Sequence, residues 1–240
     1  MQDLFVKKIK LKELDERNKY PYKIPLIANF TELEITKPVT FIVGENGSGK
    51  STLLEAVAIA LGLNPEGGSQ NFNFSSYDSH SELYKYIALE KGFRRPVTKY
   101  FLRAESFYNV ASETQKNPAA LYFGMKGISL HESSHGESFI NLIENRFYNN
   151  GLYLMDEPEA GVSPTRQMEM MILIDNLVKG GSQFIICTHS PILLSYPNAT
   201  IYQINDGVLE KIQYRDTEIF NLYEGFINNS EAYLHRLLND

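Results

Sequence analysis

Hydrophobic residues in this chain gather in short continuous runs, and between the runs stand stretches in which apolar positions recur at helical spacing. The runs predict strands at 4–10, 39–43, 98–102, 151–155, 183–187, 199–204 and 208–212. The spaced stretches predict helices at 50–61, 81–91, 137–147 and 164–178, with two more after the last strand. Because strands alternate with helices and are nearly all apolar, the pattern predicts an α/β fold with a largely parallel sheet covered on both faces.

The segments between these elements show no internal repeat, low-complexity tract or linker rich in proline and glycine. We therefore expect a single domain over residues 1–240. Residues 64–80 are rich in asparagine, serine and glycine and predict a loop. The turn Asn205-Asp206-Gly207 joins the last two strands and predicts a hairpin.

The composition fits a globular protein, with 43% hydrophobic and 22% charged residues in 240. No apolar run is long enough to cross a bilayer, so we expect no membrane insertion. The first residues do not resemble a secretion signal, and the single cysteine, Cys187, excludes an internal disulfide and a cysteine-based metal cluster. These features predict a protein of the reducing cytoplasm.

The net charge of −6 argues against a surface coated uniformly with positive charge for nucleic acid, but it leaves room for a local basic groove. Basic side chains gather at two places in the sequence. They are Lys7, Lys8, Lys10 and Lys12 near the start, and Arg94, Arg95, Lys99 and Arg103 in the middle. Such clusters are more often solvated faces than binding sites.

A glycine-rich segment joins the strand at 39–43 to the helix that follows it. It reads Gly44, Glu45, Asn46, Gly47, Ser48, Gly49, Lys50, Ser51 and Thr52. Glycines let backbone N–H groups converge on phosphate oxygens, and the N-terminus of the helix faces the same anion. The sequence therefore predicts a phosphate loop in which Lys50 reaches the outer phosphates of a nucleotide and the Ser51 hydroxyl ligates Mg²⁺.

Two later strands end in polar side chains that suit nucleotide chemistry. Asp156 and Glu157 follow the strand at 151–155, and His189 follows the strand at 183–187. The carboxyl ends of parallel strands line the ligand crevice, so we expect Asp156 to hold Mg²⁺ and Glu157 to orient or deprotonate the attacking water. His189 would contact the γ-phosphate or that water as a neutral donor. An acidic pair after a strand can also cap a helix, and we expect Cys187 to be core.

Taken together, these motifs resemble the ABC-type ATPase fold. Within it, the chain is similar to compact AAA-family ATPases related to the heads of chromosome-maintenance (SMC) and recombination-repair proteins. The resemblance rests on 44–52, on Ser134-His135-Gly136-Glu137, on 156–160 and on 188–191. It implies a phosphate-loop core at 1–62 and 151–212, a helical signature region at about 63–150 and a tail at 213–240. The long coiled coil of those heads is missing, because no heptad run separates Lys50 from Ser134.

The resemblance also implies further site residues. Ser134, Gly136 and Glu137 correspond to the signature that reads the γ-phosphate held by a second copy, although His135 and Glu137 depart from the usual residues. A plain capped helix is the alternative. Glu105 stands where the family has a glutamine near the metal. The loop Gly161-Val162-Ser163-Pro164 would lie at the dimer interface. Tyr20, Tyr22 or Phe30 could stack on adenine, but core packing is the commoner role for each.

The resulting functional expectation is an ATPase that hydrolyses ATP to ADP and phosphate with Mg²⁺. Two copies would bind head to tail across two ATP molecules, as a switch in DNA repair, genome maintenance or defence, with DNA or a partner effector protein. One alternative is the nucleotide-binding subunit of an ABC membrane transporter. Another is an ATPase that works beside a separate nuclease or toxin-like effector, since no second cluster of acids resembles a nuclease centre.

Overall fold

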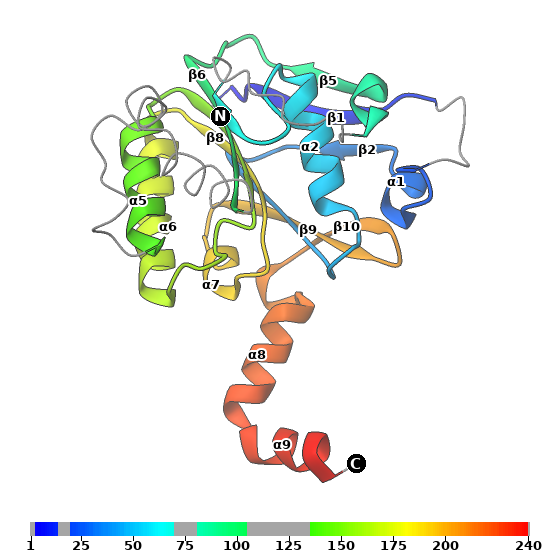
Figure 1. The fold of residues 1–240 in the computed structure, drawn as a ribbon, viewed down its shortest axis with the longest axis vertical. Coiled ribbons are helices and arrows are strands. Elements are labelled where there is room, and N and C mark those ends of the chain that lie inside the picture. The colour runs from blue at the N-terminus through cyan, green and yellow to red at the C-terminus, as the bar shows by residue number, and fades with distance from the viewer. Residues whose placement is uncertain (1–2, 14–19, 70–80, 105–134, 240) are drawn as a thin grey trace, which may run out of the picture.

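A computed structural model describes residues 3–13, 20–69, 81–104 and 135–239 (Figure 1). Its centre is a seven-stranded sheet in the order β10-β9-β3-β8-β7-β6-β4. The strands are β3 (Val39–Val43), β4 (Gly68–Ser69), β6 (Thr98–Arg103), β7 (Gly151–Asp156), β8 (Gln183–Cys187), β9 (Ala199–Asn205) and β10 (Val208–Ile212). The five inner strands are parallel, and the edge strands β10 and β4 pair antiparallel. The α/β fold expected from the sequence is confirmed.

A smaller antiparallel sheet lies beside the large one in the order β2-β1-β5. It consists of β1 (Val6–Leu11), β2 (Glu32–Glu34) and β5 (Ile87–Lys91). The side chain of Gln183, at the start of β8, joins the two sheets. Its Oε1 accepts from the backbone N–H groups of Phe5 (2.8 Å) and Val6 (3.0 Å), and its Nε2 donates to the Val6 carbonyl (2.8 Å).

The helix expected at 81–91 is wrong. Residues Glu82–Tyr86 form a short 3-10 helix, η1, and the rest is strand β5. The reason is a contact with a distant strand, because β5 pairs with β1. Ile87 lies opposite Leu11 at one end of the pairing, and Lys91 lies opposite Val6 at the other. This pairing satisfies the backbone hydrogen bonds of a segment whose residues have only a weak intrinsic preference between helix and strand. The sequence reading also missed α1 (Pro25–Asn29), β2 and α7 (Pro191–Leu194).

Helices cover both faces of the large sheet (Figure 1). On one face α2 (Lys50–Ala60) packs into a core shared with the small sheet. On the other face α5 (His135–Arg146), α6 (Pro164–Lys179) and α7 enclose a second core. Strands β3, β7 and β8 are buried along their whole length. These buried strands fix the positions of the residues that follow them.

The tail differs from the rest of the chain. After β10 come the 3-10 helix η2 (Tyr214–Asp216), α8 (Glu218–Asn228) and α9 (Ser230–Asn239). In Figure 1, α8 and α9 extend away from the body toward the C-terminus. No residue of either helix is buried. We call residues 218–239 the α8–α9 arm.

Candidate functional site

The phosphate-loop segment lies between the end of β3 and the start of α2. Gly49 caps α2 with a left-handed backbone (φ 101°). A Cβ at this position would lie 2.7 Å from Cγ2 of Ile24, so both the backbone angle and the space require glycine. The loop therefore turns directly into the helix, and the N-terminus of α2 faces the loop that precedes it.

The Lys50 ammonium lies inside this loop. Its Nζ donates to the carbonyl oxygens of Gly44 (2.7 Å) and Glu45 (2.8 Å), and the residue is buried. Burial lowers the pKa of Lys50, while the acidic groups around it, including Glu157 and Asp156, raise it. A buried amine held only by carbonyl oxygens can exchange them for the more negative oxygens of a phosphate.

Ser51 and Asp156 meet at the carboxyl end of the parallel strands. The Ser51 hydroxyl donates to Oδ1 of Asp156 at 3.0 Å. On the other side, Nε of Arg103 lies 3.7 Å from Oδ2 of Asp156, and Arg103 also binds Glu55 at 2.9 Å. A hydroxyl beside a carboxylate supplies the oxygen ligands that Mg²⁺ prefers, with its remaining positions filled by phosphate and water. The residue types therefore fit the magnesium site expected from the sequence.

Glu157 occupies a strained position directly after β7. Its φ is 49°, which a residue with a side chain seldom adopts, and its N–H donates to the Cys187 carbonyl at 2.9 Å. Its Oε1 lies 3.8 Å from Nε2 of His189, beyond hydrogen-bond range. Strain of this kind is concentrated at functional sites, where the surrounding structure holds the residue in place.

His189 lies opposite Glu157. Burial lowers its pKa, and the nearby Lys50 lowers it further, so the ring is neutral at neutral pH. Among the residues that the structure describes, its Nε2 is one of few buried side-chain polar atoms without a hydrogen-bond partner. An unpartnered polar atom at a pocket costs free energy unless a ligand binds it.

Glu159 is a site residue to which the sequence reading assigned no role. Its Oε2 accepts from the Thr188 hydroxyl at 2.7 Å, and its Oε1 accepts from the His189 backbone N–H. Burial raises the pKa of Glu159, and the two donors oppose that rise. The carboxylate thus ties the turn that carries His189 to the segment that carries Glu157. Its place two residues after the acidic pair was the one signal available.

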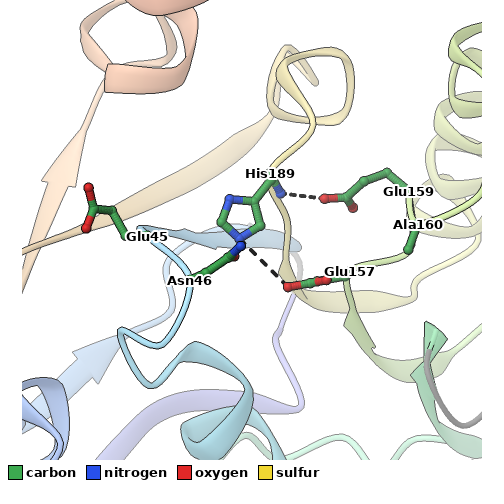
Figure 2. A pocket seen from close by; sticks show the side chains of 6 residues that line it. All are labelled: Glu45, Asn46, Glu157, Glu159, Ala160 and His189. Atoms are coloured by element: carbon green, nitrogen blue, oxygen red, sulfur yellow. Dashed lines mark hydrogen bonds and ion pairs between the residues drawn. The ribbon is translucent and has the colours of Figure 1, made fainter.

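These groups surround a pocket of about 700 Å³ (Figure 2). Glu45 and Asn46 of the phosphate loop line it together with Glu157, Glu159, Ala160 and His189. In Figure 2 the His189 ring points toward Asn46 and Glu157. The structure therefore gathers residues from three separate motifs around one cavity.

The structure describes only some of the other expected site residues. Ser134 and Glu105 are outside the described residues, as is much of the 64–80 loop. The backbone of Gly136 and Glu137 forms the first turn of α5. In the interface loop expected at 161–164, Val162 is buried and the Ser163 side chain caps α6.

The aromatic candidates for adenine stacking differ in exposure. Tyr22 and Phe30 are buried, and Tyr22 packs edge-on against Tyr86 at 5.8 Å, so both serve the core. Tyr20 is 68% exposed, so it is the one candidate of the three that the core does not bury. Cys187 is fully buried, and burial raises the pKa of its thiol.

Most side chains of the two basic clusters have partners within the described residues. Lys8 pairs with Glu32 at 3.0 Å and Lys10 with Glu90 at 3.3 Å. In the middle cluster the Arg94 guanidinium donates to the Asn150 side chain, Lys99 donates to the Leu61 carbonyl, and Arg103 binds Glu55. Most of these charges thus have partners within the chain.

Comparison with protein families identifies the chain. A model described as "AAA domain" matches residues 22–151, which are 130 of the 240 residues. The chain belongs to this AAA-domain family. A second model, described as "AAA domain, putative AbiEii toxin, Type IV TA system", matches residues 128–195 of this AAA domain. The first match contains the phosphate loop at 44–52. The second contains Asp156, Glu157 and His189.

A curated relative is the energy-coupling factor transporter ATP-binding protein EcfA2 of Mycoplasmopsis pulmonis. It is 25% identical over an alignment of 184 residues, and the match covers 62% of this chain and 60% of the relative. Among solved structures, an ATP-binding cassette of an ABC transporter in its ADP conformation matches with a TM-score of 0.51 at 17% identity. That match covers 92% of this chain and 99% of the other, and it shows the fold.

The SMC head domain from Thermotoga maritima also matches, with a TM-score of 0.44 at 16% identity over 88% of this chain and 99% of that one. The match with a TM-score of 0.51 shows that the AAA domain has the fold of an ATP-binding cassette. Among its described residues, none of the helices combines the length and the apolar character needed to span a bilayer.

Proposed function

We propose that this AAA domain is an ATPase that binds ATP with Mg²⁺ and hydrolyses it to ADP and phosphate. The observation that carries the proposal is a pocket in which the phosphate loop meets Glu157 and the unpartnered Nε2 of His189. The family match supports nucleotide binding, and the geometry supplies the groups that phosphoryl transfer to water needs.

In this mechanism Lys50 leaves the carbonyls of Gly44 and Glu45 to hold the outer phosphates. Glu157 accepts a proton from the attacking water, and neutral His189 donates through its ring nitrogen to the γ-phosphate or that water. Ser51 and Asp156 would hold Mg²⁺, which supplies charge neutralisation when bound. Catalysis then rests on positioning and charge rather than on covalent chemistry.

We further propose that two copies close head to tail over two ATP molecules, each site being completed by the signature segment 134–137 of the other copy. Hydrolysis would open the dimer, so that nucleotide state acts as a switch. DNA repair, genome maintenance or defence remains the proposed setting, with DNA or an effector protein as partner. The whole chain would act as one ATPase domain, with its core at 1–62 and 151–212.

The deciding experiment is the steady-state ATPase rate of the purified protein as a function of its concentration. Wild-type protein should hydrolyse ATP with a rate per molecule that rises with concentration until all copies are paired, and Lys50→Ala should bind no ATP and show no turnover. Lys37→Ala, in which a lysine far from the loop is lost, is the matched control. Wild-type protein without turnover, or Lys50→Ala with undiminished ATP affinity, would refute the proposal.

The same assay with linear double-stranded DNA tests the biological setting. Stimulation that disappears with added salt would mean that DNA phosphates bind the protein directly. A rate indifferent to DNA would direct the search to an effector protein.

A second candidate is the nucleotide-binding subunit of a transporter, which is favoured by the name of the relative from Mycoplasmopsis pulmonis. A transporter subunit should copurify with an integral membrane protein when extracted in mild detergent. Recovery of the protein without any membrane partner would count against this candidate.

A further inference from the structure

The α8–α9 arm carries a large apolar surface that the rest of the described chain does not cover. Seven of its large side chains have exposed fractions between 40% and 78%. They are Leu222, Tyr223, Phe226 and Ile227 on α8, and Leu234, Leu237 and Leu238 on α9. An exposed apolar surface of this extent marks an interaction site in a folded protein.

The arm is anchored firmly at its base. The Thr217 side chain is buried and caps α8 by accepting from the Phe220 N–H, and the Glu218 N–H donates to Oε1 of Gln203 at 3.0 Å. Gln203 lies opposite Val43, the residue that precedes the phosphate loop. The arm therefore leaves the body at the edge of the sheet that carries the nucleotide pocket.

The corner between the two helices is also ordered by contacts. Phe226 and Tyr233 meet edge to face with ring centroids 5.9 Å apart, and the Asn229 N–H donates to the Gly225 carbonyl at 3.0 Å. A Cβ on Gly225 would lie 2.5 Å from the Tyr233 hydroxyl. The arm thus has a defined bend, although most of its large apolar side chains remain exposed.

The charge of the arm limits what can cover it. Residues 218–239 contain three glutamates and one arginine, Arg236. Helices that lie on anionic membranes, and surfaces that bind nucleic acid, carry an excess of lysine and arginine instead. The composition therefore points to a protein surface.

We propose that this surface is a second copy of the chain, and that two arms pair to hold the protein as a dimer in the absence of nucleotide. Seven side chains of this size at these exposures present about 600–900 Å², and a stable interface needs about 800 Å² per partner. The charges favour a crossed pairing over α8 against α8. Glu218 and Glu224 give α8 two negative charges, whereas Arg236 of α9 offsets its neighbour Glu231. A twofold axis places α8 of each copy against α9 of the other.

The test is the molar mass of the nucleotide-free, full-length protein, measured by light scattering and sedimentation over a range of concentrations. Wild-type protein should have twice the chain mass of 27.4 kDa. The triple variant Leu222→Ser, Ile227→Ser, Leu237→Ser should be a monomer, with dimer affinity weakened at least about a hundredfold.

A matched control replaces three apolar residues on the body that are 62–95% exposed, Phe93→Ser, Val97→Ser and Ile172→Ser, and should remain dimeric. Because no arm residue is buried, the triple arm variant should keep the melting temperature that wild-type protein has when it is diluted to the monomer, which shows that the variant folds. Wild-type protein that is monomeric at every concentration overturns the proposal. So does a dimer that the arm variant leaves intact, or an arm found occupied by a different protein.

This proposal is separable from that of ATP hydrolysis. Lys50→Ala should lose turnover and keep the nucleotide-free dimer, whereas the arm variant should lose that dimer and keep its affinity for ATP. An inactive wild-type protein that still dimerises through the arm would refute the ATPase proposal alone.

Discussion

The pocket at the carboxyl edge of the sheet and the α8–α9 arm next to it are opposites. The pocket is polar and rests on strands that are buried throughout, whereas the arm is apolar and buries none of its residues. Around the pocket most polar groups satisfy one another, as Lys50 does with the Gly44 carbonyl and Ser51 with Asp156, while Nε2 of His189 has no hydrogen-bond partner. In the arm, most of the large apolar side chains remain exposed to water.

Because of this difference, the two surfaces would respond differently to their ligands. Polar groups can pair internally and exchange partners when a ligand arrives, so a nucleotide site can be stable before it is filled. Apolar side chains gain only from the removal of water, so an uncovered arm gains nothing until another surface meets it. The pocket is therefore suited to reversible exchange and the arm to lasting association.

The largest expected effect concerns the chemistry of the pocket. Glu157→Gln keeps the size of the side chain but removes the group that accepts the proton. We expect ATP binding to persist and kcat to fall about 10²- to 10⁴-fold, measured by phosphate release under saturating ATP. The control is Glu169→Gln, a carboxylate of α6 paired with Arg166 outside the pocket, which should leave kcat unchanged. Wild-type turnover by Glu157→Gln would remove the residue from the role of base.

A smaller effect compares the scaffold of the pocket with the arm. Leu154→Ala, in the buried strand β7, should lower the free energy of unfolding by about 2–5 kcal/mol, because it leaves a cavity in the core. Leu238→Ala, at a position 78% exposed in α9, should change it by less than about 0.5 kcal/mol when the protein is diluted to the monomer. Urea titration at low protein concentration measures both. Similar losses in the two variants would show that the arm is part of the folded core.

The smallest effect is the pH dependence contributed by Glu159. Burial raises the pKa of this carboxyl above its unfolded value, so the folded state binds the proton more tightly. Its contribution to stability is thus present below the unfolded pKa and lost as pH rises through the folded pKa, at about 1.4 kcal/mol for each tenfold difference in proton affinity. Glu159→Gln should flatten this part of the stability profile.

The control for Glu159→Gln is Glu169→Gln, which should keep the wild-type slope. Because Glu159 positions His189, the variant should also lower kcat with little change in KM. If the stability profile of Glu159→Gln matches that of the wild type, the buried carboxyl does not titrate differently on folding.

The sequence predicts those parts of the fold and of the site that depend on residues close together in the chain. The strands at 39–43 and 183–187 were predicted to the residue, because each is a continuous apolar run that the sheet buries on both faces. The phosphate loop was recognisable for a similar reason, since its residues are adjacent in the chain. The 81–91 segment failed because its partner β1 lies some eighty residues earlier.

Contacts between distant residues account for the rest. The link from Glu159 to Thr188 and His189 spans about thirty residues, and no spacing rule connects them. The sequence predicts two helices after the last strand, yet it does not tell whether the remainder of the chain covers them. That is a property of the assembled fold.

The amide of Gln183 has a consequence for how this chain can change over evolutionary time. Its oxygen and its nitrogen are both committed to the backbone of a strand nearly 180 residues away. Glutamate would set a carboxylate against the Val6 carbonyl, and an aliphatic residue would strand two buried N–H groups. Substitution of Gln183 is therefore limited by the need to join the two sheets rather than by any role in the pocket. A variant that loses the amide would have a folding defect.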